Sequence, residues 1–434
     1  MEPTATVFLA SPGSIIVAVI TIVFILRRTW PLLFRPKADR TTEPTATQAS
    51  SNPSLVVSKE PELPEGWWTG RDVFELERRA LFSQTWLYIA HSAQFGKPGA
   101  YQSFDIAGFP VFLIRGKDDK IRAFHNVCRH RAYTITRKET GMSTVLGCRY
   151  HGWSYDTTGR LVKAPQFEDI PGFDKSRNSL FEVHTHTTDQ GLVFVNLNSG
   201  QPAASDETVT SNLVAGLEGK STWIAGQTFS GDFNWKVGAR GRQLDAFTKE
   251  LDRRVSEISG PAFTMKLVRS IMRKSTRKHN VFFPTTLISS FENVDLSLAL
   301  SFFPASESKT HIRYDLFSCS KVSEHEVQQL SRMLQTSIEE LVGDMKVEYL
   351  SISNKQGWLR LKLSYLIVFP ALRQILYRLQ EHVKLERIQG TQILPAMHKP
   401  EGSTLFQQAD QLCKELDCVS GGSQDGTSSR TLDW

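Results

Sequence analysis

The amino-acid sequence predicts an α+β protein with two globular domains, preceded by a hydrophobic N-terminal segment. Between residues 86 and 198, short apolar runs alternate with turns that contain Gly, Asp or Pro, a pattern typical of antiparallel strands. Beyond residue 221, amphipathic helical segments and strand-like runs both occur, which favours a mixed domain built on an antiparallel sheet. Residues 7–26 carry no charge, which predicts a transmembrane helix.

The composition of the chain bounds its class. With 434 residues, 40% of them hydrophobic and 22% charged, the chain can form two sizeable cores. The net charge of +6 is not gathered in long Lys/Arg blocks, so we expect no nucleic-acid partner. Five cysteines is an odd number, and Cys319, Cys413 and Cys418 are scattered, which favours a reducing compartment over a disulfide framework.

The N-terminal segment is expected to anchor the chain in a membrane. Its 20 uncharged residues, 7–26, are enough to cross ~30 Å of hydrocarbon. No basic stretch precedes it, whereas basic residues follow it, so the positive-inside rule places the rest of the chain in the cytosol. We therefore expect a single-pass membrane protein with a cytosolic globular part, the endoplasmic reticulum being the expected membrane. A cleaved signal peptide and a buried helix are the alternatives.

The first globular domain is expected at residues 63–200, after a flexible linker of Thr, Ser, Ala and Pro at residues 38–62. It opens with an amphipathic helix that is capped near Asp72. Strands are expected at residues 86–90, 111–114, 144–146 and 192–195, with a hairpin tip at 117–120.

The second domain is expected at residues 221–418, with a disordered tail at residues 419–434. Residues 243–258 carry an apolar stripe at helical spacing, and residues 322–350 form a second expected helix. Strands are expected at residues 280–290, 297–303 and 311–318. The apolar and basic stretch 358–379, interrupted by Pro370, is expected to be a kinked helix; a membrane-surface segment and an error in the gene model are the alternatives.

Two short motifs carry the chemistry of the first domain. Cys128 and His130 form a Cys-x-His pair, Cys148 and His151 form a Cys-x2-His pair, and 17 residues separate the pairs. Two thiolates and two imidazoles match the ligands of a Rieske [2Fe-2S] centre, in which the cysteines hold one iron and the histidines the other. Zinc also accepts a Cys2His2 set, but Cys-x-His is an unusual half-site for a zinc finger. The sequence thus predicts a [2Fe-2S] cluster on these four residues.

Residues 63–197 resemble the N-terminal half of a Rieske non-haem iron oxygenase α subunit, in a membrane-anchored, fungal-like form. The resemblance rests on Trp67-Trp68, on residues 122–131 and 148–153 around the four ligands, and on the Asn-Trp-Lys segment at 234–236. Rieske proteins of respiratory complexes carry two further cysteines that bridge the cluster loops. Neither loop has a second cysteine here, which favours the oxygenase type.

The resemblance also implies a mononuclear Fe(II) held by two histidines and a carboxylate. The family's two histidines lie on the helix that follows Asn-Trp-Lys, but residues 237–258 contain no histidine, and Phe247 and Asp252 stand at the two expected places. A site built from distant residues such as His279 and His311 is left open, and no catalytic residue is assigned. Carboxylates are available on both expected helices: Asp245, Glu250, Asp252, Glu339, Glu340, Asp344 and Glu348.

Three interpretations remain for the whole chain. It is an oxygenase with a non-standard iron site, an electron-transfer or degenerate Rieske protein without a mononuclear iron, or a mis-spliced oxygenase altered near residues 238–243. The first is preferred. It implies electrons from NAD(P)H through a separate reductase, since no Gly-rich dinucleotide fingerprint follows a strand. The expected substrate is an apolar small molecule, such as a secondary metabolite or a sterol-like compound, and a homo-oligomer is left open.

Overall fold

The computed structural model describes residues 63–202, 221–239, 242–259, 279–291, 295–353 and 370–396. The expected anchor at 7–26, the linker at 38–62, the tail at 419–434 and residues 358–369 of the apolar stretch lie outside these ranges. None of the helices within them is both long and apolar enough to span a membrane.

The first domain is built on antiparallel strands, as the sequence predicts. It begins with α2 (Arg71–Glu77), which continues as a π-helical turn (Arg78–Phe82). A seven-stranded sheet has the order β1-β10-β9-β4-β3-β2-β5, and a small sheet has the order β6-β7-β8. The strands are β1 (Leu87–His91), β2 (Ala100–Ile106), β3 (Phe109–Arg115), β4 (Ile121–His125), β5 (Thr140–Met142), β6 (Val145–Gly147), β7 (Ser154–Asp156), β8 (Leu161–Lys163), β9 (Glu182–Thr187) and β10 (Leu192–Asn196).

Burial explains why the central strands form where they do. The four consecutive apolar residues from Val111 to Ile114 in β3 are all fully buried, because both faces of this strand are covered. The chain then turns back at residues 117–120, where Gly116 donates its N–H to the Lys120 carbonyl at 2.8 Å. The hairpin tip expected at these residues is therefore confirmed.

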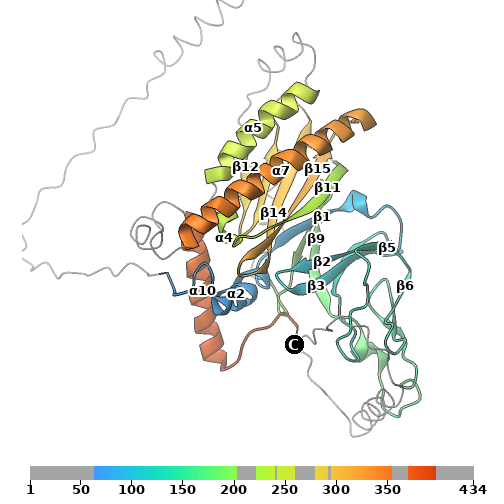
Figure 1. Ribbon diagram of the computed structural model, residues 1–434. Helices are drawn as coiled ribbons and strands as arrows, with labels where there is room; N and C mark the ends of the chain where they lie inside the picture. The colour runs from blue at the N-terminus through green and yellow to red at the C-terminus, as the bar shows by residue number, and fades with distance from the viewer. Residues whose placement is uncertain are drawn as a thin grey trace, which may run out of the picture. The chain divides into compact units, whose positions relative to one another are not determined.

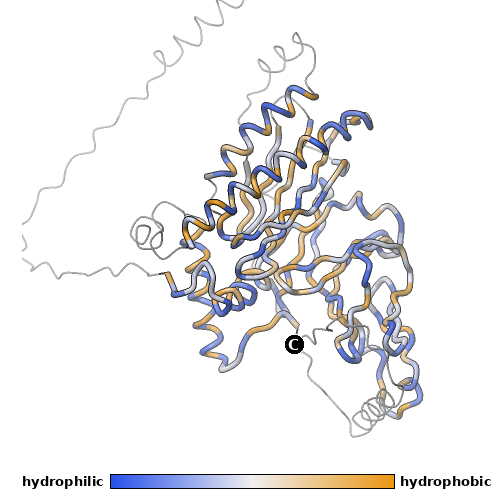
Figure 2. The backbone as a smooth tube through the Cα atoms, in the orientation of Figure 1, coloured by the Kyte–Doolittle hydropathy of each residue, from blue (hydrophilic) through white to orange (hydrophobic). Residues whose placement is uncertain are grey.

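The second domain combines a five-stranded antiparallel sheet with helices, which confirms the α+β class. The sheet has the order β11-β15-β14-β13-β12, and Figure 1 shows α5 and α7 running side by side over it. Figure 2 shows hydrophilic and hydrophobic residues alternating along both helices, as expected where one face is buried. The elements are β11 (Thr222–Gly231), α4 (Lys236–Ala239), α5 (Arg242–Ser259), β12 (His279–Phe282), β13 (Thr286–Ser290), β14 (Leu296–Ser306), β15 (Lys309–Ser318), α7 (Glu324–Ser353) and α10 (Pro370–Gln389).

The structure corrects one expectation for this domain and adds a strand that the sequence did not predict. Residues 280–290 are not one strand: β12 and β13 form a hairpin around a turn that contains a cis Phe283–Pro284 bond. Strand β11 was not expected, because only Gly231 of its ten residues is buried and its sequence lacks the apolar signal of a core strand. It pairs along β15 at the edge of the sheet.

One hydrophobic core connects the two domains. It contains Trp67 and Trp68 before α2, Trp235 before α4, and the buried face of α7. Within it, the Asn-Trp-Lys segment binds the N-terminal helix, since Trp235 Nε1 donates to Glu77 Oε2 at 2.7 Å and Lys236 pairs with the same carboxylate. The Asn-Trp-Lys segment thus has a structural role in joining the domains.

Candidate metal centre

Two loops of the first domain bring the four predicted ligands together. Cys128 follows β4, and its loop closes where the Cys128 N–H donates to the Tyr133 carbonyl at 2.8 Å. Cys148 follows β6, and its N–H donates to the Trp153 carbonyl at 2.7 Å, while Gly152 N–H returns to the Cys148 carbonyl at 3.0 Å. Gly152 has a φ of +71°, a left-handed conformation that glycine adopts without strain. Each loop is therefore a closed turn that holds its pair of ligand-type residues.

The two thiols lie side by side inside the protein. Cys128 is 2% exposed and Cys148 is 3% exposed, and their side chains share a hydrogen bond. Backbone N–H groups also point at the sulfurs: that of His130 at Cys128, and those of Tyr150 and His151 at Cys148. The Tyr155 hydroxyl lies 3.2 Å from Cys128 Sγ. The sulfurs thus sit in a shell of hydrogen-bond donors.

The two imidazoles lie next to each other and differ in exposure. The ring centroids of His130 and His151 are 4.5 Å apart at an interplanar angle of 72°. His130 is buried and stacks on Trp153 at 5.0 Å, while Phe167 contacts it edge-on at 4.9 Å. His151 is half-buried and packs against Tyr150 at 4.0 Å. His151 is accordingly the member of the set that lies nearest to solvent.

The thiol pair is prepared for metal binding by its electrostatics. The hydrogen bond from Cys128 lowers the pKa of Cys148 to about 6, whereas the same hydrogen bond, together with burial, raises the pKa of Cys128. The shared hydrogen bond therefore favours the thiolate form of Cys148, and thiolate is the form that ligates iron.

The donor set fits a two-iron cluster better than a single ion. Within the part of the chain that the structure describes, no three His, Cys, Asp or Glu side chains converge on one metal ion. A structural zinc ion needs four ligands around one centre. A Rieske cluster needs only two protein ligands at each of its two irons, and the buried sulfur pair and adjacent imidazole pair supply them.

The places expected for a second iron are occupied differently. Phe247 in α5 is half-buried and packs against the core. Glu250, on the same helix, is held by Arg253 and Arg254, and these ion pairs lower its pKa to about 2. On α7, Glu339, Glu340 and Asp344 are exposed and Glu348 is half-buried. The structure does not gather these carboxylates into a site with histidine.

Comparison with known proteins agrees with this geometry. The model of the Rieske [2Fe-2S] domain family matches residues 85–174. The chain is 37% identical to the chlorobenzene dioxygenase subunit alpha of a Cupriavidus species over 193 residues, which cover 42% of this chain and 41% of that one. It is 31% identical to the carnitine monooxygenase oxygenase subunit of Acinetobacter baumannii over 145 residues, which cover 33% and 39% of the two chains. The chain thus spans about two fifths of the length of these relatives.

Solved structures extend the similarity of fold beyond the first domain. A quaternary ammonium Rieske monooxygenase superposes with a TM-score of 0.54 at 20% identity, covering 68% of this chain and 86% of that one. A naphthalene 1,2-dioxygenase variant with phenanthrene bound gives a TM-score of 0.55 at 18% identity, covering 66% and 80%.

The chain thus contains a Rieske [2Fe-2S] domain at residues 85–174. Over part of its length it is similar to oxygenase subunits of a dioxygenase and a monooxygenase.

Proposed function

We propose that this chain is an iron–sulfur oxidoreductase whose [2Fe-2S] cluster is held by Cys128, Cys148, His130 and His151. The observation that carries the proposal is the convergence of two buried thiols and two adjacent imidazoles on closed loops. When bound, the cluster supplies reversible one-electron transfer.

The surrounding residues tune that transfer. Hydrogen bonds to the sulfurs, from the Tyr155 hydroxyl and from the backbone of the two loops, stabilise the more negative, reduced state. Trp153 and Phe167 keep water away from His130. His151, which is half-buried, would be the cluster ligand nearest to an electron-transfer partner.

The electrons come from NAD(P)H through a separate reductase, and they support the O2-dependent oxidation of an apolar small molecule. Support for O2-dependent oxidation comes from the relatives, which are dioxygenase and monooxygenase subunits. Of the two compounds in their names, chlorobenzene is apolar and carnitine is charged. We favour a secondary metabolite or sterol-like substrate because of the expected membrane anchor, and we expect the chain to act as a homo-oligomer.

The proposed setting is the cytosolic face of a membrane, with residues 7–26 as a single-pass anchor, in the endoplasmic reticulum. The uncharged run of 20 residues and the basic residues after it support this proposal. Deleting residues 1–37 should move the protein from the membrane fraction to the soluble fraction, whereas deleting residues 419–434 should not. A shortened chain that stays in the membrane fraction would rule out the anchor.

A second candidate function is electron transfer by a Rieske protein without a mononuclear iron. The specific observation in its favour is that α5, the helix that follows Asn-Trp-Lys, has no histidine.

The cluster is tested by substituting one of its ligands. His151→Ala should abolish the visible absorption and the EPR signal of a Rieske cluster, because alanine cannot ligate iron. His184→Ala is a matched control on β9, since the His184 ring hydrogen-bonds to the Gly200 carbonyl and is not one of the four proposed ligands, and it should keep both signals. Retention of both signals in His151→Ala would show that the ligand assignment is wrong.

A further inference from the structure

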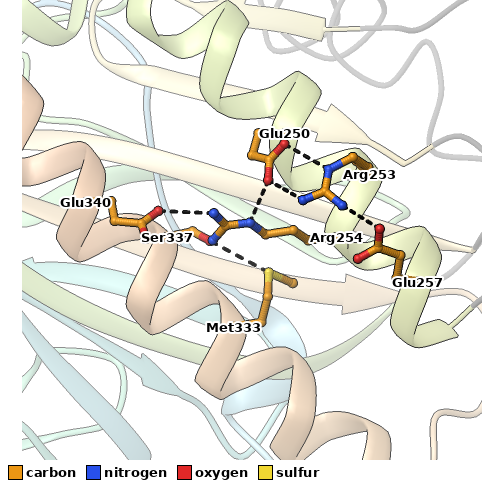
Figure 3. A network of polar contacts seen from close by, with 7 residues as sticks. All are labelled: Glu250, Arg253, Arg254, Glu257, Met333, Ser337 and Glu340. Carbon is orange, nitrogen blue, oxygen red and sulfur yellow. Dashed lines mark hydrogen bonds and ion pairs between the residues drawn. The ribbon is translucent and has the colours of Figure 1, made fainter.

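A network of hydrogen bonds around Arg254 connects α5 with α7 in the second domain. Arg254 of α5 donates from Nε to Glu250 Oε1 at 2.8 Å, from Nη1 to Ser337 Oγ at 2.9 Å, and from Nη2 to Glu340 Oε2 at 3.3 Å. Ser337 in turn donates to Met333 Sδ at 3.8 Å (Figure 3). Carboxylates from both helices therefore already have a cationic partner, and the guanidinium between them repels a divalent cation.

The rest of the contact is apolar. Leu244, Leu251 and Val255 form the buried face of α5, and Phe247 packs beside them. On the facing helix, Leu334, Ile338 and Leu341 are buried in the same core. These side chains have no atoms that ligate iron, which requires imidazole nitrogen and carboxylate oxygen.

The chain offers no histidine pair to replace the missing one. Of its 11 histidines, five lie beyond residue 221: His279, His311, His325, His382 and His398. The residues outside the described ranges on either side of α5, 240–241 and 260–278, contain no His, Cys, Asp or Glu. The same is true of residues 354–369, which follow α7.

Within the described residues, the backbones of His279 and His311 are far apart, and the side chains of His311 and His382 have polar partners. The strand register places His279 level with Leu316 of β15, with β13 and β14 between them. His311 lies five residues from Leu316 along β15, so the backbones of His279 and His311 are about 20 Å apart. Residues whose backbones are this far apart do not share one ion, which argues against the site from His279 and His311 that the sequence left open. His311 contacts Ser230 Oγ at 3.0 Å, and His382 contacts Glu386 on α10 at 3.3 Å.

We infer that the second domain of this chain holds no mononuclear iron, and that electrons leave the cluster for an acceptor outside the chain. The acceptor is a one-electron oxidant on a separate protein. In each transfer the reduced cluster loses one electron and the acceptor gains it. This inference rests on the proposed cluster but not on the proposed oxidation, which would take place on the partner.

The experiment is a count of iron and acid-labile sulfide in the full chain, purified anaerobically and reconstituted with ferrous iron and sulfide. Two irons and two sulfides per chain are expected. Three irons with two sulfides would overturn the inference and leave the cluster intact. A chain without sulfide and without a Rieske EPR signal would instead overturn the proposed cluster, and the inference with it.

Two further measurements make the test independent of the total count. His151→Ala should lose all of its iron, and one residual iron per chain would overturn the inference. After nitric oxide is added to the ferrous wild-type protein, no EPR signal of a mononuclear iron nitrosyl is expected. The appearance of that signal would also overturn the inference. His311→Ala and His382→Ala should each keep two irons per chain; the loss of iron from either would identify a hidden ligand.

Discussion

Lys236 Nζ lies 2.5 Å from Glu77 Oε1, and the two side chains are 1% and 0% exposed. This ion pair joins the end of α2 in the first domain to the start of α4 in the second. Three tryptophan rings surround the ammonium, with centroids at 4.9 Å for Trp67, 5.6 Å for Trp68 and 5.7 Å for Trp235. Burial lowers the pKa of Lys236, and the charge of Glu77 opposes that effect.

Removing one member of this pair should strongly destabilise the fold. Lys236→Met leaves Glu77 charged and buried without its cation, so the free energy of unfolding should fall by about 3–5 kcal/mol. The double variant Glu77→Leu/Lys236→Met removes both charges and should recover part of that loss. Urea unfolding followed by tryptophan fluorescence measures both, and a single variant as stable as the wild type would contradict the prediction.

At a second polar contact between the domains, two substitutions should lower the free energy of unfolding by different amounts. The Asp315 carboxylate accepts hydrogen bonds from Tyr88 at 3.2 Å and Trp223 at 2.9 Å, and it pairs with buried Arg313 at 2.9 Å. Tyr88→Phe removes one hydrogen bond and should cost about 1 kcal/mol. Asp315→Ala leaves the buried Arg313 guanidinium without its carboxylate partner. It should lower the free energy of unfolding by about 3–5 kcal/mol in the same experiment. Equal effects of the two substitutions would argue against this ranking.

Acid should destabilise the protein through a buried histidine. Burial lowers the pKa of His125 to about 4, below the ordinary value of 6.5, so the unfolded chain binds this proton more readily than the folded one. The stability is therefore complete above pH 6.5 and is lost as the pH falls toward 4, by about 3 kcal/mol at the lower end. His125→Phe should flatten this part of the stability profile between pH 7 and pH 4, and an unchanged slope would assign it to other groups.

The hydroxyl of Tyr155 should set the potential of the proposed cluster. Tyr155→Phe removes the group that lies 3.2 Å from Cys128 Sγ, and with it a hydrogen bond that favours the reduced state. A difference of about 1–2 kcal/mol corresponds to a potential lower by roughly 40–90 mV for a one-electron couple. Redox titration monitored by EPR measures the shift. Tyr377→Phe, an exposed position on α10, should leave the potential unchanged.

Much of the fold follows from local patterns in the sequence. The strand at 111–114, the hairpin tip at 117–120 and the helix at 243–258 were all expected and are confirmed, because apolar periodicity and turn residues act over a few positions. Strand β11 was missed because edge strands bury few side chains. The hairpin within 280–290 was missed because its turn lies inside a continuous apolar run, which was interpreted as a single strand.

Local spacing alone determined the four residues of the candidate metal centre, since each Cys and His pair lies within a single loop. Only the tertiary structure shows which distant residues of the rest of the chain contact one another. Glu77 and Lys236 are 159 residues apart, and Arg254 and Ser337 are 83 apart, so no short-range pattern could reveal that they meet. The closed α5–α7 contact is such a long-range outcome. Complementary charge and apolar packing between α5 and α7 produce this contact.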